Sequence, residues 1–132
     1  MLKIRRVATA TAAALITMGV IAPAASAGGN WDYGTSRTVL SNGYLYTSLN
    51  SGTVSGWNVD DWYQKTGGGT ITARFGYTYR GSSKTGGWFS QGANSTKRAT
   101  WSNQTINTCD SLVGWLQVDG QQTFNNAPVT AC

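Results

Sequence analysis

The sequence predicts an all-β domain, built as a small antiparallel β-sandwich or a partly closed barrel. The chain after residue 27 contains no Glu and no His but is rich in Thr, Trp and Tyr, which favour strands. No stretch of about ten residues in that part shows a convincing 3.6-residue apolar period. Glycines interrupt it every few residues, as expected for short strands joined by tight turns.

Residues 1–27 have the three parts of a secretory signal. A positively charged start is followed by an Ala-rich apolar run from Val7 to about Ala22, and the small residues 24–27 end it. The alternative is a membrane anchor, but the run is shorter than the about 20 residues of a spanning helix. We therefore expect cleavage after Ala27. The product is a single secreted, extracellular bacterial domain over residues 28–132, with no transmembrane segment.

Loss of this segment lowers the formal net charge of the protein. The full chain carries +5, from ten Lys and Arg against five acidic residues, all of them Asp. Three of the basic residues precede residue 28, so seven remain against five Asp and the net charge becomes +2. Nucleic-acid binding needs a concentrated basic stripe. We therefore expect no nucleic-acid partner.

The first predicted strands lie between residues 37 and 79. Asn42-Gly43 indicates a hairpin turn between strands at 37–40 and 44–49. Residues 70–79 alternate well between apolar and polar side chains, apart from Gly76, which predicts a strand with one buried face. The apolar side of that strand consists of Ile71, Ala73, Phe75, Tyr77 and Tyr79.

The middle of the chain is expected to contain two loops and two strands. Glycine-rich residues 67–69 and 81–87 indicate loops. A short strand begins at Trp88, and another covers 96–101, where polar and apolar side chains alternate.

The C-terminal part combines a hairpin with a disulfide. Residues 112–118 are almost uniformly apolar and predict a central strand. Asp119-Gly120 then turns the chain into a return strand at 121–124. Because Cys109 and Cys132 form an even pair in an exported domain, we expect them to be bonded, which would stabilise the domain by about 3 kcal/mol. Two cysteines without histidine do not complete a metal site, so we expect no metal and no cofactor.

Residues suited to catalysis are scarce. Without His the chain has no Ser-His-Asp or Cys-His site, and without Glu any acid–base pair must come from Asp. Asp60 and Asp61 are adjacent, so on a strand they would point to opposite faces. A glycosidase pair of distant Asp residues and a calcium site at 58–61 remain alternatives. We favour a solvated turn or strand end at 58–61, and no enzymatic activity.

Aromatic residues are the stronger functional signal. All six Trp and six Tyr follow residue 27. A small core needs two or three such rings, and Phe75, Tyr77 and Trp115 suit that role. The excess predicts aromatic side chains on a binding surface. Because Trp62 and Tyr63 are adjacent, one should be buried and the other exposed. The aromatic residues that we expect to bind a ligand are Trp57, Trp62, Tyr63 and Trp88.

Residues 28–34, Gly-Gly-Asn-Trp-Asp-Tyr-Gly, and 39–44, Val-Leu-Ser-Asn-Gly-Tyr, resemble the lactococcin 972 family of secreted bacteriocins. The resemblance implies a small, exported, all-β protein. It also implies killing of related bacteria through the lipid-linked wall precursor, by interference with cell-wall synthesis at the septum. It adds Trp31, Tyr33 and Tyr44 to the expected ligand-binding residues.

The sequence thus favours a secreted bacteriocin-like protein acting at the envelope of competing bacteria by non-enzymatic binding. Its partner would be a cell-wall precursor or an envelope glycan. The alternative is a secreted β-sandwich binding module, an adaptor or inhibitor subunit that recognises a glycan or another secreted protein in an extracellular assembly.

Overall fold

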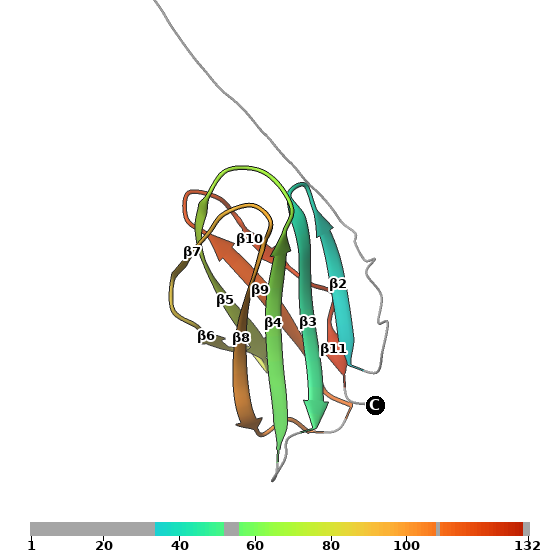
Figure 1. Cartoon of the computed structure of the whole chain (residues 1–132). Helices are drawn as coiled ribbons and strands as arrows, with labels where there is room; N and C mark the ends of the chain where they lie inside the picture. The colour runs from blue at the N-terminus through green and yellow to red at the C-terminus, as the bar shows by residue number, and fades with distance from the viewer. Residues whose placement is uncertain (1–33, 52–55, 108, 131–132) are drawn as a thin grey trace, which may run out of the picture.

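A computed structural model describes residues 34–51, 56–107 and 109–130 of the chain. These residues form antiparallel strands and no helix, so the all-β prediction is confirmed (Figure 1). None of them belongs to a helix with the length and apolarity needed to cross a membrane. The expected signal segment, residues 1–27, lies outside the described residues.

The first sheet has four strands in the order β2-β3-β4-β8. The predicted β2–β3 hairpin is present, but Leu40 pairs with Gly43, so the turn residues are Ser41 and Asn42 rather than Asn42 and Gly43. The strands of this sheet are β2 (Thr35–Leu40), β3 (Gly43–Ser51), β4 (Trp57–Lys65) and β8 (Ser95–Gln104).

The second sheet has the order β10-β9-β5-β6, with β7 also paired to β5 and β11 also paired to β9. The predicted central position of β9 is confirmed, because β9 pairs with β5 on one side and with β10 and β11 on the other. The strands are β5 (Ile71–Tyr79), β6 (Ser82–Thr85), β7 (Phe89–Gln91), β9 (Ser111–Val118), β10 (Thr123–Asn125) and β11 (Val129–Thr130).

Several segments differ from the sequence prediction, which contained neither β4 nor β11. Residues 81–87 are not wholly a loop, because β6 lies within them and pairs with β5 through Tyr77 and Lys84. Every residue of β6 is exposed, so no apolar alternation marks it as a strand. Residues 58–61 are not a solvated turn or strand end but lie in the first half of β4, and Asp61 there is fully buried.

The core lies between the two sheets, which face each other as two layers (Figure 1). Phe75 and Tyr77 are core residues as predicted. Trp115 is buried too, but on the opposite side of β9, where its ring covers Gly76 and its indole N–H donates to Thr78 Oγ1. One core cluster consists of Leu49, Val59, Tyr77, Ile106, Leu112 and Val129, and the other of Leu45, Tyr63, Ala73, Phe75, Leu116 and Val118.

Three buried polar residues, Thr47, Asp61 and Asn126, join the two sheets together with the backbone of Gly114; we call this set the polar bridge. Asn126 Nδ2 donates to Thr47 Oγ1 at 2.7 Å, and Thr47 Oγ1 donates to Asp61 Oδ1 at 2.8 Å. Asn126 N also donates to the carbonyl oxygen of Gly114 at 2.9 Å. Thr47 and Asp61 belong to the first sheet, whereas Gly114 belongs to the second.

Glycine at 114 is required by this close approach. A Cβ at that position would lie 1.9 Å from Thr47 Oγ1 and 2.4 Å from Asp61 Oδ1. Contacts this short force one sheet away from the other or break the bridge.

We predict that Gly114→Ala lowers the free energy of unfolding by about 1–3 kcal/mol or more, because the added methyl overpacks the bridge. Urea unfolding followed by Trp fluorescence measures the change. Gly69→Ala is the matched control, since nothing lies within 4 Å of its added Cβ. Equal stability of the two variants would contradict the role of Gly114.

Candidate functional site

The outer face of the first sheet gathers aromatic and arginine side chains. Along β3 and β4, Leu45 and Tyr63 point into the core, so their neighbours Tyr44, Tyr46 and Trp62 point outward. Cross-strand pairing places Arg37, Tyr46, Trp62 and Arg98 in one row across the four strands. We call this surface the outer face; its members are Arg37, Val39, Tyr44, Tyr46, Asp60, Trp62, Arg98 and Thr100.

Three side chains of this row stack as a column. The rings of Tyr46 and Trp62 lie 4.8 Å apart between centroids and are nearly parallel, at 6°. The Arg98 guanidinium lies over the Trp62 ring, 4.4 Å from its centroid. Because β3 and β8 flank β4, Tyr46 and Arg98 approach Trp62 from opposite sides. Such cation–π and aromatic pairs each contribute about 0.5–1.5 kcal/mol.

Asp60 fixes the arginine end of the column. Its Oδ1 accepts a hydrogen bond from Thr100 Oγ1 and lies 3.7 Å from Arg98 Nη1. Its Oδ2 accepts a weaker bond from Asn50 Nδ2 at 3.4 Å. The Arg98 side chain is still 53% exposed, so its N–H groups are available to a ligand.

The stacking decides which ligands the outer face suits. Both faces of the Trp62 ring are covered, by Tyr46 and by Arg98, so a sugar ring cannot stack there. The surface instead presents ring edges and guanidinium groups. Guanidinium binds carboxylate and phosphate through paired hydrogen bonds. Trp, Tyr and Arg are also the residues that dominate binding energy at protein interfaces.

Val39 extends the outer face with an apolar contact. It is 64% exposed and lies opposite Tyr44 in the β2–β3 pairing. The Arg37 guanidinium lies 5.2 Å from the centroid of the Tyr44 ring. Arginine therefore stands at both the β2 and the β8 end of the surface, with aromatic and apolar groups between.

Trp88 lies apart from this surface, in the segment between β6 and β7. It is 47% exposed, and the Arg74 guanidinium lies 4.6 Å from the ring centroid. Arg74 belongs to β5 of the second sheet, where its Nε donates to Gln117 Oε1 at 2.8 Å. Trp88 is thus held on a different sheet from Trp62.

The other expected binding residues have different positions. Tyr63 is a core residue, only 4% exposed, and burial raises the pKa of its hydroxyl to about 12. Trp62 is more exposed than Tyr63, as predicted for the adjacent pair. Trp57 begins β4 and packs against the core from its edge. Trp31 and Tyr33 lie outside the described residues.

Sequence reasoning missed Tyr46, Arg37 and Arg98. Strand alternation alone places Tyr46 on the same face as Tyr44. The two arginines are harder to find, because their place beside the aromatic rings depends on the registers of β2 with β3 and of β4 with β8.

Asp61 is not accessible to a substrate, as a catalytic carboxyl would have to be. It is fully buried in the polar bridge, and within the described residues its Oδ2 has no hydrogen-bond partner. Burial raises the pKa of the Asp61 carboxyl well above its ordinary value, and the nearby Asp60 charge raises it further. Hydrogen bonds from Thr47 and from the backbone of Trp115 lower this pKa, but burial outweighs them.

The residues that the structure describes contain no group of three or more Asp or Cys side chains that could hold a metal ion. At 58–61 the Asn58 Oδ1 accepts a hydrogen bond from Asn103 N instead, at 3.3 Å.

Comparisons with protein-family models, with curated proteins and with solved structures give no match to this chain.

We predict that Asp61 makes the protein less stable as the pH rises. Between the ordinary carboxyl pKa of about 3.9 and the higher pKa in the fold, the folded state holds a proton that the unfolded chain has lost. The free energy of unfolding therefore falls across that window, by about 1.4 kcal/mol for each unit of difference, and is fully retained below about pH 4. Asp61→Asn should flatten this dependence in urea unfolding between pH 4 and 8.

Asp119→Asn is the matched control for this measurement, since Asp119 is an exposed carboxyl in the turn between β9 and β10 and is not among the groups that shift the pKa of Asp61. It should keep the wild-type slope. The same slope in wild type and Asp61→Asn would show that Asp61 is not held neutral in the core.

Proposed function

We propose that this protein is a secreted β-sandwich of bacteriocin type that acts at the envelope of competing bacteria, by binding an envelope component rather than by catalysis. The main support for this proposal is the composition of the outer face. It presents two arginines around aromatic and apolar groups on a rigid four-stranded sheet. The resemblance of residues 28–34 and 39–44 to the lactococcin 972 family supports the same proposal.

The chemistry of this face favours an anionic ligand. Arg98 lies over Trp62 with its side chain half exposed, and Arg37 stands at the opposite end of the same row. Phosphate groups are abundant on lipid-linked wall precursors and on anionic envelope polymers. A phosphate bound between ring edges and guanidinium groups needs no enzymatic residue. The face is fixed by stacking before the ligand arrives, which lowers the entropy cost of binding.

The second candidate is a secreted binding module that recognises a glycan or a protein partner. Trp88 favours it, because the Arg74 guanidinium lies over its ring while the side chain remains 47% exposed. An aromatic ring with an open face can stack against a sugar. This candidate predicts that glycan binding depends on Trp88 rather than on Trp62.

The covalent form of the secreted protein is part of the proposal. We place the mature N-terminus at Gly28 and a disulfide between Cys109 and Cys132. Cys109 follows β8 and precedes β9, in a left-handed backbone conformation with φ of 70°. Cys132 lies outside the described residues. A bond between them would fix the C-terminal segment after β11.

We predict that Trp62→Ala weakens binding of the mature protein to envelopes of related bacteria by about tenfold or more, because it removes the centre of the column. Binding to purified envelopes by sedimentation, together with growth inhibition over a panel of strains, measures the effect. Trp88→Ala is the matched control and should bind as wild type.

Three results would decide against the bacteriocin proposal. They are full binding by Trp62→Ala, loss of glycan binding in Trp88→Ala alone, or the absence of any bound or inhibited strain. The second would favour the glycan-binding module. Circular dichroism of both variants should confirm that each is folded.

We also predict the intact mass of the secreted protein. It should correspond to residues 28–132 less two hydrogen atoms, and no thiol should react with an alkylating reagent before reduction. Two reactive thiols in the native protein, or retention of residues 1–27, would contradict this part of the proposal.

A further inference from the structure

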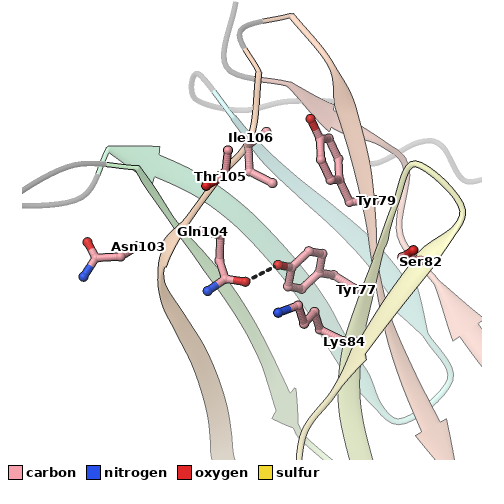
Figure 2. Close-up of a pocket in the computed structure, with 8 residues that line it drawn as sticks. All are labelled: Tyr77, Tyr79, Ser82, Lys84, Asn103, Gln104, Thr105 and Ile106. Carbon is pink, nitrogen blue, oxygen red and sulfur yellow. Dashed lines mark hydrogen bonds between the residues drawn. The ribbon is translucent and has the colours of Figure 1, made fainter.

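The second feature that suits a ligand is a pocket of about 330 Å³ between the two sheets, a volume at the small end of the range for ligand sites. It opens between β6, an edge strand of the second sheet, and β8, an edge strand of the first sheet. Figure 2 shows its lining: Tyr77, Tyr79, Ser82, Lys84, Asn103, Gln104, Thr105 and Ile106.

Two tyrosines line the pocket: Tyr79 gives it an aromatic wall with a partly buried ring, whereas the Tyr77 side chain is only 3% exposed. The Tyr77 hydroxyl donates to Gln104 Oε1 at 2.6 Å, a bond that joins the second sheet to the first (Figure 2). The Tyr79 hydroxyl donates to Asp110 Oδ2 at 2.6 Å and accepts from Asn107 N at 3.0 Å. The rings are therefore held in place without a ligand.

Lys84 gives the pocket a positive charge. It is the one charged residue in the lining and lies directly opposite Tyr77 in the β5–β6 pairing. Lys84 forms no ion pair among the described residues. Asp110, which accepts the hydrogen bond from the Tyr79 hydroxyl, is already paired with Arg80 at 2.8 Å and is not part of the lining. The pocket therefore lacks the negative charge that would complement Lys84.

Polar side chains complete the lining. The Asn103 backbone has a φ of 56°, in the left-handed region, which a non-glycine residue rarely adopts. Asn103, Ser82 and Thr105 add an amide and two hydroxyl groups to the lining. An aromatic wall combined with amide and hydroxyl groups suits a sugar ring, and an ammonium group suits a carboxylate on that ring.

We propose that this pocket binds an acidic sugar, with the pyranose ring against Tyr79 and the carboxylate at Lys84. The site is separate from the outer face, because the column residues Tyr46, Trp62 and Arg98 point away from the core whereas Tyr77 points into it. The proposal therefore does not depend on envelope binding by that face.

The test is a titration of the ¹⁵N-labelled mature protein with glucuronic acid, with glucose as the neutral match, followed by amide chemical shifts. Glucuronic acid should cause saturable shifts at Tyr77, Lys84 and Gln104 and should bind at least about tenfold more tightly than glucose. Lys84→Gln should remove that preference. Lys97→Gln, on the same β8 strand as Gln104 but outside the lining, should keep it.

The proposal is overturned if neither sugar shifts these amides, if glucose binds as tightly as glucuronic acid, or if Lys84→Gln retains the preference. Trp62→Ala should leave the titration unchanged. A failure of this site is thus distinguishable from a failure of the outer face.

Discussion

The polar bridge is the constraint on which the rest of the structure depends. Asp61, Thr47 and Asn126 are hydrogen-bonded in the space that a side chain at Gly114 would fill. A buried carboxyl is costly unless it is neutral and hydrogen-bonded, which is why burial raises the pKa of Asp61. The cost of burying a carboxyl also makes the register of β4 specific. A shift of β4 by one residue would turn Asp61 outward and force Asp60 into the core, away from its Arg98 and Thr100 partners on β8.

That constraint connects the core to the outer face. Because side chains alternate along a strand, burial of Asp61 and Tyr63 directs Trp62 outward. The pairing of β3 and β4 that places Thr47 beside Asp61 also places Tyr46 beside Trp62. The register that completes the polar bridge therefore builds the aromatic column on the opposite side of the same two strands. The proposed binding surface rests on that register rather than on a flexible loop.

The sequence predicts the strands whose own side chains carry the pattern. Residues 71–79 alternate, and Ala73 and Phe75 are buried as the alternation requires. Strand β6 was not predicted, because its residues are all exposed and form a strand only through backbone pairing with β5. Burial of Asp61 depends on Gly114 from the other sheet, which no local pattern reveals. A difference of one residue in the β2–β3 turn likewise decides that Arg37 lies opposite Tyr46.

We propose that the outer face, which this register organises, is the surface that binds the bacterial envelope. Transferred cross-saturation from envelope vesicles to the isotope-labelled mature protein tests it directly, because signals weaken only where protons lie close to the vesicle. We expect the largest losses at Tyr44, Tyr46 and Trp62, which share the outer face. Larger losses at Trp88 and Arg74, or equal losses over both sheets, would contradict it.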